Sequence, residues 1–235
     1  MEKSRRDLVR GARHGIPIML GYLSVSFGFG IFAVSSGLSP FIATLISAVN
    51  LTSAGQFAGV TVIAAAGTLV ELVLTQLVIN ARYALMSLSL SQKLDPSFSF
   101  SHRCVAAFGM TDEIFAVAAS QPYPVTPAYM YGLILVSMAG WTGGTVLGAV
   151  AGKLLPAFIV SAMGILLYGM FIAIVLPPAK KNRRILFVVG AAALCSVAFY
   201  YLVPALSSGF SVIISAVVAA ALGAWLFPSE SEAGV

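Results

Sequence analysis

Residues 128–152 read AYMYGLILVSMAGWTGGTVLGAVAG and contain no charged side chain. A helix needs about 20 predominantly apolar residues to cross the hydrocarbon core of a bilayer, so this stretch is long enough for one transmembrane span. Its glycines at positions 140, 144, 148 and 152 recur every four residues and therefore share one helix face. Such a face lets a neighbouring helix approach closely, either within one bundle or between copies of the chain.

Similar apolar stretches recur along the whole chain. The 235 residues are 59% hydrophobic and 9% charged, with a mean hydropathy of +0.98, whereas soluble domains carry about 25% charged residues. We therefore exclude a water-soluble globular protein and predict an all-α, polytopic helical membrane bundle that forms a single integral membrane transport domain over residues 1–235. The expected apolar segments lie near residues 16–36, 40–66, 68–91, 103–120, 128–152, 156–177, 185–204 and 208–227.

Six of these segments fit one full span each, and two do not. Segment 40–66 is long and is interrupted by the polar residues 50–56, and segment 103–120 is short and contains Thr111-Asp112-Glu113. We expect both to be broken, re-entrant or short, which gives six to eight crossings. Non-helical backbone at membrane depth survives only where it is buried in protein or lines an aqueous cavity. Both segments are therefore candidates for a central site.

Basic residues indicate the orientation of the chain. One cluster lies within residues 3–13 and another at residues 180–184. Beside membrane spans such clusters favour the cytoplasmic side rather than a nucleic-acid site, which places the N-terminus in the cytoplasm. If both unusual segments cross, the basic loop at residues 93–103 lies outside, and if both turn back, every basic region lies inside. If only one crosses, residues 180–184 lie outside, so the two segments should behave alike.

A polar stripe marks the third segment. Gln76, Asn80, Tyr83 and Ser87 fall on one face of the expected helix, as a solute pathway or as hydrogen-bonding groups between packed helices. Arg82 lies on the opposite side. It is expected to be either a charge in the pathway or the structural partner of an acidic residue, because an isolated charge at membrane depth is costly.

Asp112 and Glu113 are two neighbouring carboxylates inside an apolar segment. A carboxylate that can gain and lose a proton at membrane depth is what proton coupling requires. We therefore assign both residues to proton coupling and to binding of a substrate amine. The alternative is a helix that starts here, with Thr111 as its N-cap and the acids in its first turn. The two interpretations are compatible.

The polar residues 50–56 offer a second half of a binding site. An unwound stretch followed by a helix N-terminus attracts a carboxylate, which Ser53 and Gln56 could bind. Phe57 and Phe27 could add apolar contacts. Together with Asn80 and Tyr83 of the stripe, these residues form the expected substrate site. The alternative is a polar turn outside the membrane between two short helices.

No motif for ATP hydrolysis, for metal binding or for catalysis is visible. The sequence has no G-x-x-x-x-G-K-[ST] or H-E-x-x-H pattern, and its two histidines lack ligand spacing. We therefore expect no cofactor, no metal site and no catalytic residue, and a protein that is not an enzyme.

Several of these stretches resemble a known family. They are Gly11 through Pro17 to Gly21, Phe27-Gly28-Phe29-Gly30, Ser53-Ala54-Gly55-Gln56-Phe57, Asn80-Ala81-Arg82-Tyr83 and Thr111-Asp112-Glu113-Ile114-Phe115-Ala116. In their order and spacing the chain resembles the AzlC-like proteins, the large subunits of bacterial branched-chain amino acid exporters. The resemblance implies a secondary transporter of the bacterial plasma membrane that exports valine, leucine, isoleucine or related solutes. It also implies a small AzlD-like membrane subunit as partner.

Other functions remain open at this level. A membrane-embedded enzyme acting on a lipid or peptide would need a nucleophile and base or a metal near an interface. A non-catalytic subunit of a larger membrane complex would need neither. The expected partners are an amino acid substrate, membrane lipid and the small subunit. A second copy of the chain, packed against the glycine faces, is an alternative partner.

Overall fold

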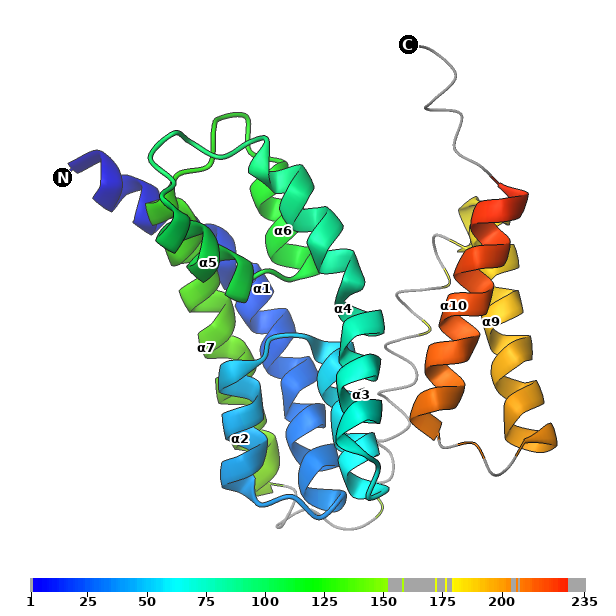
Figure 1. Ribbon diagram of the computed structural model, residues 1–235. Helices are drawn as coiled ribbons and strands as arrows, with labels where there is room; N and C mark the ends of the chain where they lie inside the picture. The colour runs from blue at the N-terminus through cyan, green and yellow to red at the C-terminus, as the bar shows by residue number, and fades with distance from the viewer. Residues whose placement is uncertain are drawn as a thin grey trace. The chain divides into compact units, whose positions relative to one another are not determined.

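The computed structural model describes residues 2–151, 179–203 and 208–227, together with positions 158, 172, 176 and 206. Within them the chain is helical and has no β-strand, which confirms the all-α prediction. The helices in Figure 1 are α1 (Glu2–Ser35), α2 (Pro40–Val49), α3 (Ser53–Ala64), α4 (Leu69–Ser91), α5 (Phe100–Phe108), α6 (Asp112–Ala119), α7 (Pro127–Ala151), α9 (Arg183–Leu202) and α10 (Ser208–Leu226).

Four of these helices, α1, α4, α7 and α9, are long and apolar enough to cross a membrane. They correspond to four of the six expected full spans, and α10 corresponds to a fifth. The segment expected at residues 156–177 lies outside the described residues, apart from positions 158, 172 and 176. Helix α1 begins at Glu2, well before the apolar run that starts at residue 16. At 1.5 Å per residue its 34 residues span about 51 Å, so its basic first turns extend beyond a hydrocarbon core about 30 Å thick.

The chain divides into two compact units, Met1–Val60 with Asn80–Gly164 and Thr61–Ile79 with Ile165–Val235. In the second unit α9 and α10 pack on each other, with the rings of Phe187 and Phe227 5.6 Å apart in an edge-to-face arrangement. The first unit holds every residue of the candidate site.

The scaffold of the first unit is a parallel pair formed by α1 and α7 (Figure 1). A Cβ atom built on Gly132 would overlap the backbone of Leu8, and one built on Gly148 would overlap the backbone of Phe27. The residue numbers at these contacts increase along both helices, from Leu8 and Gly132 to Phe27 and Gly148. The two helices therefore run in the same direction. The prediction of close packing from the glycine spacing is confirmed at positions 140, 144 and 148, whereas position 152 lies outside the described residues.

The first unusual segment forms a hairpin of α2 and α3. The hydroxyl of Ser47 on α2 lies 2.7 Å from that of Thr145, near the C-terminal end of α7. Gln56, at the start of α3, reaches Trp141, which lies one turn further back on α7. One residue later, Phe57 packs edge-on against Phe29, in the last turns of α1. The chain therefore enters from the C-terminal end of the α1–α7 pair, turns at residues 50–52 and heads back toward that end.

The second unusual segment, α5 and α6, forms a hairpin from the opposite end. His102 on α5 lies 2.5 Å from the Tyr131 hydroxyl in the first turns of α7, and a Cβ atom on Gly109 would overlap Ile134 further along. Glu113 at the start of α6 reaches Tyr22 in the middle of α1. The other end of α6 is tied back by Lys93, whose amine donates to the carbonyl of Ala119.

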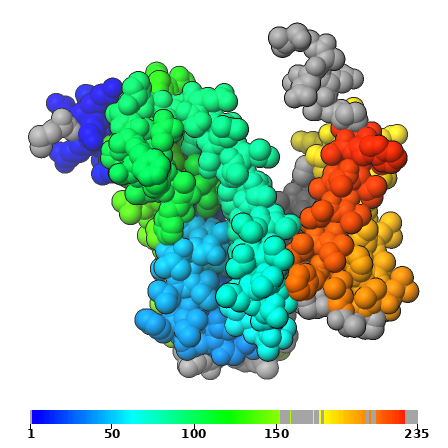
Figure 2. Space-filling model, in the orientation of Figure 1, coloured from blue at the N-terminus to red at the C-terminus, as the bar shows by residue number. Residues whose placement is uncertain are grey.

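Both unusual segments thus turn back rather than cross. Helix α2 has 10 residues and is about 15 Å long, half the thickness of the hydrocarbon core. On the face shown in Figure 2, the blue surface of α2 lies toward one end of the first unit and the green surface of α5 toward the other. The two segments have the same hairpin geometry, as the expectation that they behave alike requires.

The two hairpins form an inverted repeat. Helices α2 and α3 enter from one end of the α1–α7 pair, and α5 and α6 enter from the other. Leu94, which follows α4, bridges Val125 just before α7. Ser39 and Ser99 cap the two entering helices in the same way, each accepting a hydrogen bond from the backbone N–H three residues later. Inverted repeats of this kind are common in secondary transporters.

Candidate functional site

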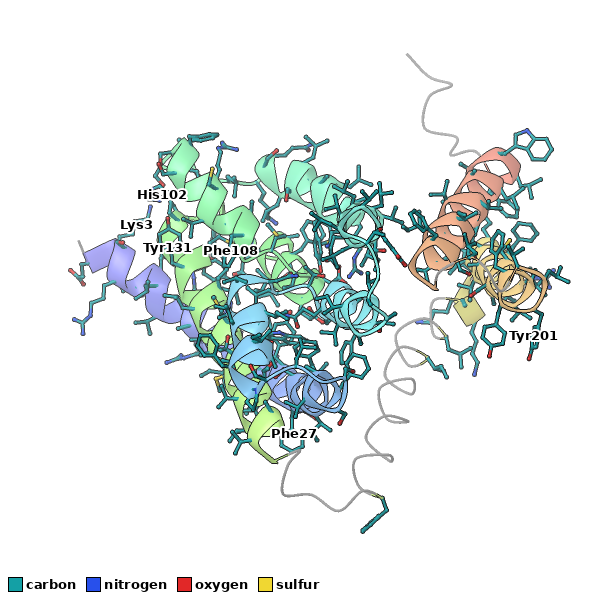
Figure 3. All side chains as sticks on the ribbon, turned by 60° about the horizontal axis from the view of Figure 1, so that its bottom comes forward. Lys3, Phe27, His102, Phe108, Tyr131 and Tyr201 are labelled. Atoms are coloured by element: carbon teal, nitrogen blue, oxygen red, sulfur yellow. The ribbon has the colours of Figure 1, made fainter. Side chains whose placement is uncertain are left out.

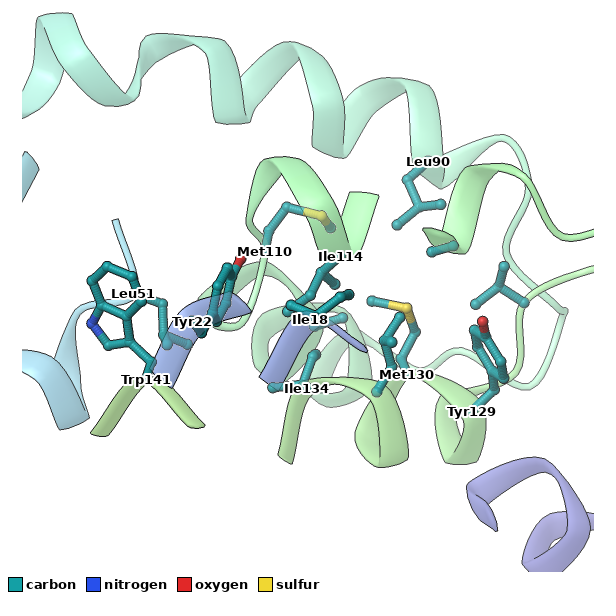
Figure 4. Close-up of a cluster of buried hydrophobic side chains, with 14 of the residues drawn as sticks. Ile18, Tyr22, Leu51, Leu90, Met110, Ile114, Tyr129, Met130, Ile134 and Trp141 are labelled. Atoms are coloured by element: carbon teal, nitrogen blue, oxygen red, sulfur yellow. The ribbon is translucent and has the colours of Figure 1, made fainter. Parts of the chain in front are cut away.

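The two hairpin turns meet in the middle of the α1–α7 pair. Each turn has three residues between its helices, and the central residue of each, Leu51 and Met110, is buried. Figure 4 shows both within one apolar cluster beside Tyr22 of α1 and Trp141 of α7. The rings of Tyr22 and Trp141 are 5.3 Å apart in an edge-to-face contact. The candidate site is therefore built from the two turns and this aromatic pair.

Gln56 holds the first turn together. Its Nε2 donates to the backbone carbonyls of Ile46, at 3.3 Å, and Asn50, and its Oε1 accepts from Trp141 Nε1 at 3.0 Å. The side chain is 2% exposed. Thr52 caps α3 by accepting the N–H of Gly55 at 3.0 Å. In this conformation the amide of Gln56 is occupied with the turn, and its role in binding substrate stays a prediction.

Ser53 and Phe57 flank Gln56 on α3. Ser53 is half-buried at the first position of the helix, where backbone N–H groups precede the first intrahelical hydrogen bonds. Phe57 is buried against Phe29 and Phe32, with ring centroids 5.1 and 5.2 Å away. The proposed apolar residue Phe27 lies further along α1, where its backbone contacts Gly148; Figure 3 labels its side chain at that end of the unit.

Thr111 and Glu113 form the second turn with Tyr22. Thr111 is the N-cap of α6 and accepts the N–H of Ile114 at 3.2 Å, as the alternative interpretation of this segment required. The Tyr22 hydroxyl lies 2.6 Å from Thr111 Oγ1 and 2.5 Å from Glu113 Oε2. An acidic residue directly after the turn of the second hairpin is thereby hydrogen-bonded to α1, the helix against which both hairpins pack.

Arg82 and Asp112 form an ion pair between α4 and α6. Arg82 Nη1 lies 2.6 Å from Asp112 Oδ2, with side chains 45% and 46% exposed. The guanidinium also stacks over the ring of Tyr83, 5.1 Å from its centroid. Of the two expectations for Arg82, the geometry favours the structural partner of an acidic residue. The two neighbouring carboxylates therefore differ, since among the described residues Glu113 has no cation within ion-pair distance.

The polar stripe on α4 is divided between the two units. Asn80, Tyr83 and Ser87 are half-buried in the first unit, whereas Gln76 belongs to the second. Tyr83 joins the site through Arg82, whose Nη2 lies 3.4 Å from its hydroxyl. Asn80 lies on the same face one turn earlier. Their roles in a solute pathway stay predictions.

Sequence reasoning missed Tyr22 and Trp141. Both lie in uninterrupted apolar segments, so neither disturbs the hydropathy pattern. A weak signal existed for Trp141, because it directly follows Gly140 and precedes Gly144 on the packing face of its helix. Buried tyrosine and tryptophan usually require a hydrogen-bond partner. That rule would have directed attention to the polar turns.

A groove of about 550 Å³ lies at the end of the α1–α7 pair where both helices begin. It is lined by the first turns of α1, the loop after α4 and the starts of α5 and α7. Figure 3 labels Lys3, His102 and Tyr131 in this region. In the loop, Ser97 donates from its N–H and its hydroxyl to Asp95 Oδ1, which holds the pKa of the Asp95 carboxyl below its ordinary value.

Comparisons with known proteins identify other membrane proteins as relatives. The chain is 32% identical over 176 residues to an uncharacterized membrane protein of Archaeoglobus fulgidus, covering 74% of this chain and 77% of that protein. It is 28% identical to the inner membrane protein YgaZ of Escherichia coli, over 75% of each chain. It is 23% identical to the branched-chain amino acid transport protein AzlC of Bacillus subtilis, over 72% of this chain and 66% of that one. No solved structure gave a significant match. Residues 17–155, more than half of the chain, match the family model described as AzlC protein, and this multi-pass membrane protein therefore belongs to the AzlC family.

Proposed function

We propose that this protein is a secondary transporter that exports branched-chain amino acids across the bacterial plasma membrane in exchange for protons. One observation carries the proposal: two half-membrane hairpins enter from opposite ends and bring two helix N-termini together at the level of Tyr22 and Trp141. Broken helices at mid-depth, arranged as an inverted repeat, are typical of substrate sites in secondary transporters.

The chemistry of the two turns suits an amino acid. The start of α3, with Ser53, provides backbone N–H groups and a partial positive charge that favour a carboxylate. The start of α6 carries Asp112 and Glu113, which favour an ammonium group. An aliphatic side chain requires apolar surroundings, which Phe57 and the ring of Tyr83 would supply after a local rearrangement. The name of the Bacillus subtilis relative supports branched-chain amino acids as the substrate class.

The two carboxylates are proposed to have different roles. Asp112 is neutralised by Arg82 at 2.6 Å, so it orients the start of α6. Glu113 is hydrogen-bonded to the neutral Tyr22 and remains partly exposed. Because no cation pairs with it among the described residues, Glu113 is the better candidate to exchange a proton when substrate binds or leaves.

The orientation is proposed from the same fold. The basic loop at residues 93–103 lies at the end where α1 and α7 begin, since Lys93 reaches Ala119 and its neighbour Leu94 bridges Val125. The basic first turns of α1 lie at that end too, because Lys3 and His102 line the same groove. Positive charge on one side of the membrane favours a cytoplasmic N-terminus. A small AzlD-like subunit completes the transporter in this proposal.

A reconstitution experiment tests the proposal. The chain is purified with and without the small subunit and inserted into proteoliposomes loaded with radiolabelled leucine. We expect efflux to accelerate under an imposed proton gradient, to slow when a protonophore collapses the gradient, and to be inhibited by valine and isoleucine but not by lysine. Absence of leucine efflux above protein-free vesicles, with and without the subunit, would overturn the proposal.

Two matched substitutions test the assignment of roles. Glu113→Gln removes a titratable group and keeps a hydrogen-bond acceptor for Tyr22, so we expect proton-driven efflux to be lost. Asp112→Asn leaves Glu113 in place and is expected to weaken efflux without removing its response to the gradient. If both variants respond to the gradient as the wild type does, the proton role of these carboxylates is wrong.

A further inference from the structure

Resting on the proposed function, we infer that Tyr22 is a positioning residue that transmits the protonation state of Glu113 to the turns of both hairpins. The inference deepens the proposed role of Glu113 and concerns residues of α1 and α7 that no sequence motif singled out. It is carried by three contacts, Tyr22 to Glu113, Tyr22 to Thr111, and Tyr22 to Trp141.

The Tyr22 hydroxyl lies near more hydrogen-bond acceptors than it has protons to donate. A tyrosine hydroxyl has one proton, yet Tyr22 lies within hydrogen-bond distance of two oxygens, 2.6 Å from Thr111 Oγ1 and 2.5 Å from Glu113 Oε2. When Glu113 is ionised it can only accept, so Tyr22 donates to it. The hydroxyl proton of Thr111 then points to the Tyr22 oxygen, while Thr111 Oγ1 still accepts the N–H of Ile114.

Protonation of Glu113 reverses this order. The new carboxyl proton can be donated to the Tyr22 oxygen, and the Tyr22 proton then turns to Thr111 Oγ1. Thr111 has to direct its own proton elsewhere, although it is the N-cap of α6. At the same time the start of α6 loses a negative charge that favours a helix N-terminus. One proton gained by Glu113 therefore alters both the hydrogen bonds of the N-cap residue Thr111 and the charge at the turn of the second hairpin.

Trp141 carries the change to the first hairpin. The Tyr22 ring is in edge-to-face contact with Trp141, whose Nε1–H is donated to Gln56 Oε1 at 3.0 Å. All three side chains are buried, with Tyr22, Trp141 and Gln56 7%, 1% and 2% exposed. A shift of the Tyr22 ring would therefore move the neighbouring protein side chains and not solvent. Gln56 in turn holds the carbonyl of Asn50 at the other turn. A single buried path thus joins the acidic turn to the amide turn.

The charged and titratable groups around Glu113 come from three helices. Tyr22 faces it from α1, Asp112 precedes it on α6, and Arg82 and Tyr83 approach from α4. Arg82 is engaged by Asp112, and Tyr83 stacks under Arg82. Tyr22 is therefore the neighbour whose hydrogen bond must change when Glu113 changes its charge.

The test compares Tyr22→Phe with Tyr131→Phe. Both substitutions remove a hydroxyl that lies 2.5 Å from a titratable side chain, and both keep the ring, but Tyr131 contacts His102 far from the turns. The first readout is the pH profile of leucine efflux from proteoliposomes. We expect its steepest part to flatten in Tyr22→Phe, with proton stimulation reduced about tenfold, as expected for a lost hydrogen bond to a charged group. Tyr131→Phe should keep the wild-type profile.

A second readout does not depend on transport. The infrared band of the protonated carboxyl of Glu113, identified by its loss in Glu113→Gln, is followed during a pH titration. Its midpoint should move in Tyr22→Phe and stay in place in Tyr131→Phe. Thr111→Ser keeps a hydroxyl and should behave as the wild type in both readouts, whereas Thr111→Val should follow Tyr22→Phe.

The outcomes separate this inference from the proposed function. If wild-type efflux is proton-driven and Tyr22→Phe has an unchanged pH profile and carboxyl midpoint, the inference is overturned and the transporter proposal stands. If no leucine moves in any variant, the transporter proposal is overturned, and a shifted midpoint in Tyr22→Phe alone still supports the role of Tyr22.

Discussion

The hairpin α2–α3 and the hairpin α5–α6 have the same construction and different chemistry. Each begins with a serine N-cap, turns within three residues around a buried apolar side chain, and starts its second helix with a threonine N-cap, Thr52 or Thr111. The first turn is then held by a neutral amide, Gln56, which is fully engaged and buried. The second is held by carboxylates that remain partly exposed.

If the protein is the proton-coupled transporter proposed above, this difference between the two hairpins would give its transport a direction. Two identical hairpins would respond in the same way to the same signal. A turn held by an amide has no proton of its own to exchange, whereas a turn held by Glu113 and Tyr22 would change its hydrogen bonds directly with each proton gained or lost. Under the proposed function, the symmetry of the backbone would provide two related gates, and the side chains would place the titratable group at one of them.

The largest expected effect comes from the scaffold that both hairpins share. Gly148→Ala would drive a Cβ atom into the backbone of Phe27, whereas Gly143 on the same helix has no atom near its Cβ position. Overpacking at a backbone contact should cost about 3 kcal/mol, while Gly143→Ala should be neutral or slightly stabilising. Thermal unfolding of the purified variants in detergent measures the difference. Equal stability of the two variants would mean that α1 and α7 do not approach as closely as described.

A smaller effect on the free energy of unfolding should distinguish the turn of the first hairpin from the turn of the second. Gln56→Met keeps the volume of the side chain but leaves the Trp141 N–H and the Asn50 carbonyl without their partner, at a cost of about 2–3 kcal/mol. Glu113→Gln keeps an acceptor for Tyr22 and should cost less than about 1 kcal/mol.

Tryptophan fluorescence provides a local measurement for this pair. The chain has two tryptophans, so in a Trp225→Phe background the emission reports on Trp141 alone. The spectrum should shift more in Gln56→Met, which removes the hydrogen-bond acceptor of Trp141, than in Glu113→Gln, which acts on Trp141 only through Tyr22. An unchanged spectrum in Gln56→Met would contradict the amide network.

Much of this arrangement could be predicted from local sequence. Interruptions of apolar segments located both turns, one of the two interpretations of the acidic segment placed Thr111 at a helix start, and charge counting required the two unusual segments to behave alike. These features depend on neighbouring residues or on charge per loop. The helical first turns of α1 were not predicted, because hydropathy identifies the part of a helix inside the bilayer and not its extension into water.

The contacts that define the site could not be predicted in this way. Tyr22 and Glu113 are separated by 91 residues, and Gln56 and Trp141 by 85, so only the folded chain brings them together. The inverted repeat was also invisible, since the two halves share capping residues and turn length rather than an extended run of identical residues. Its recognition required knowing the direction in which each short helix runs.

A third effect should be equal in the two hairpins. Thr52→Val and Thr111→Val each remove a threonine N-cap and keep the shape of the side chain, so each should cost about 1 kcal/mol in thermal unfolding. The matched Thr→Ser variants should be close to the wild type. A cost for one cap and none for the other would argue that the correspondence of the two hairpins is limited to the path of the backbone.

The smallest effect concerns a contact that belongs to one hairpin only. Arg82 and Asp112 are each nearly half-exposed, so their attraction is screened and should contribute about 0.5 kcal/mol. A double-mutant cycle of Arg82→Gln, Asp112→Asn and the combined variant measures this coupling free energy by thermal unfolding, and it should fall as salt is added. In efflux assays each single variant leaves an unpaired charge at the start of α6, so the double variant should transport better than either one. If instead the double variant is as impaired as the worse single variant, Arg82 or Asp112 contacts the substrate directly, and the ion pair would then do more than orient the start of α6.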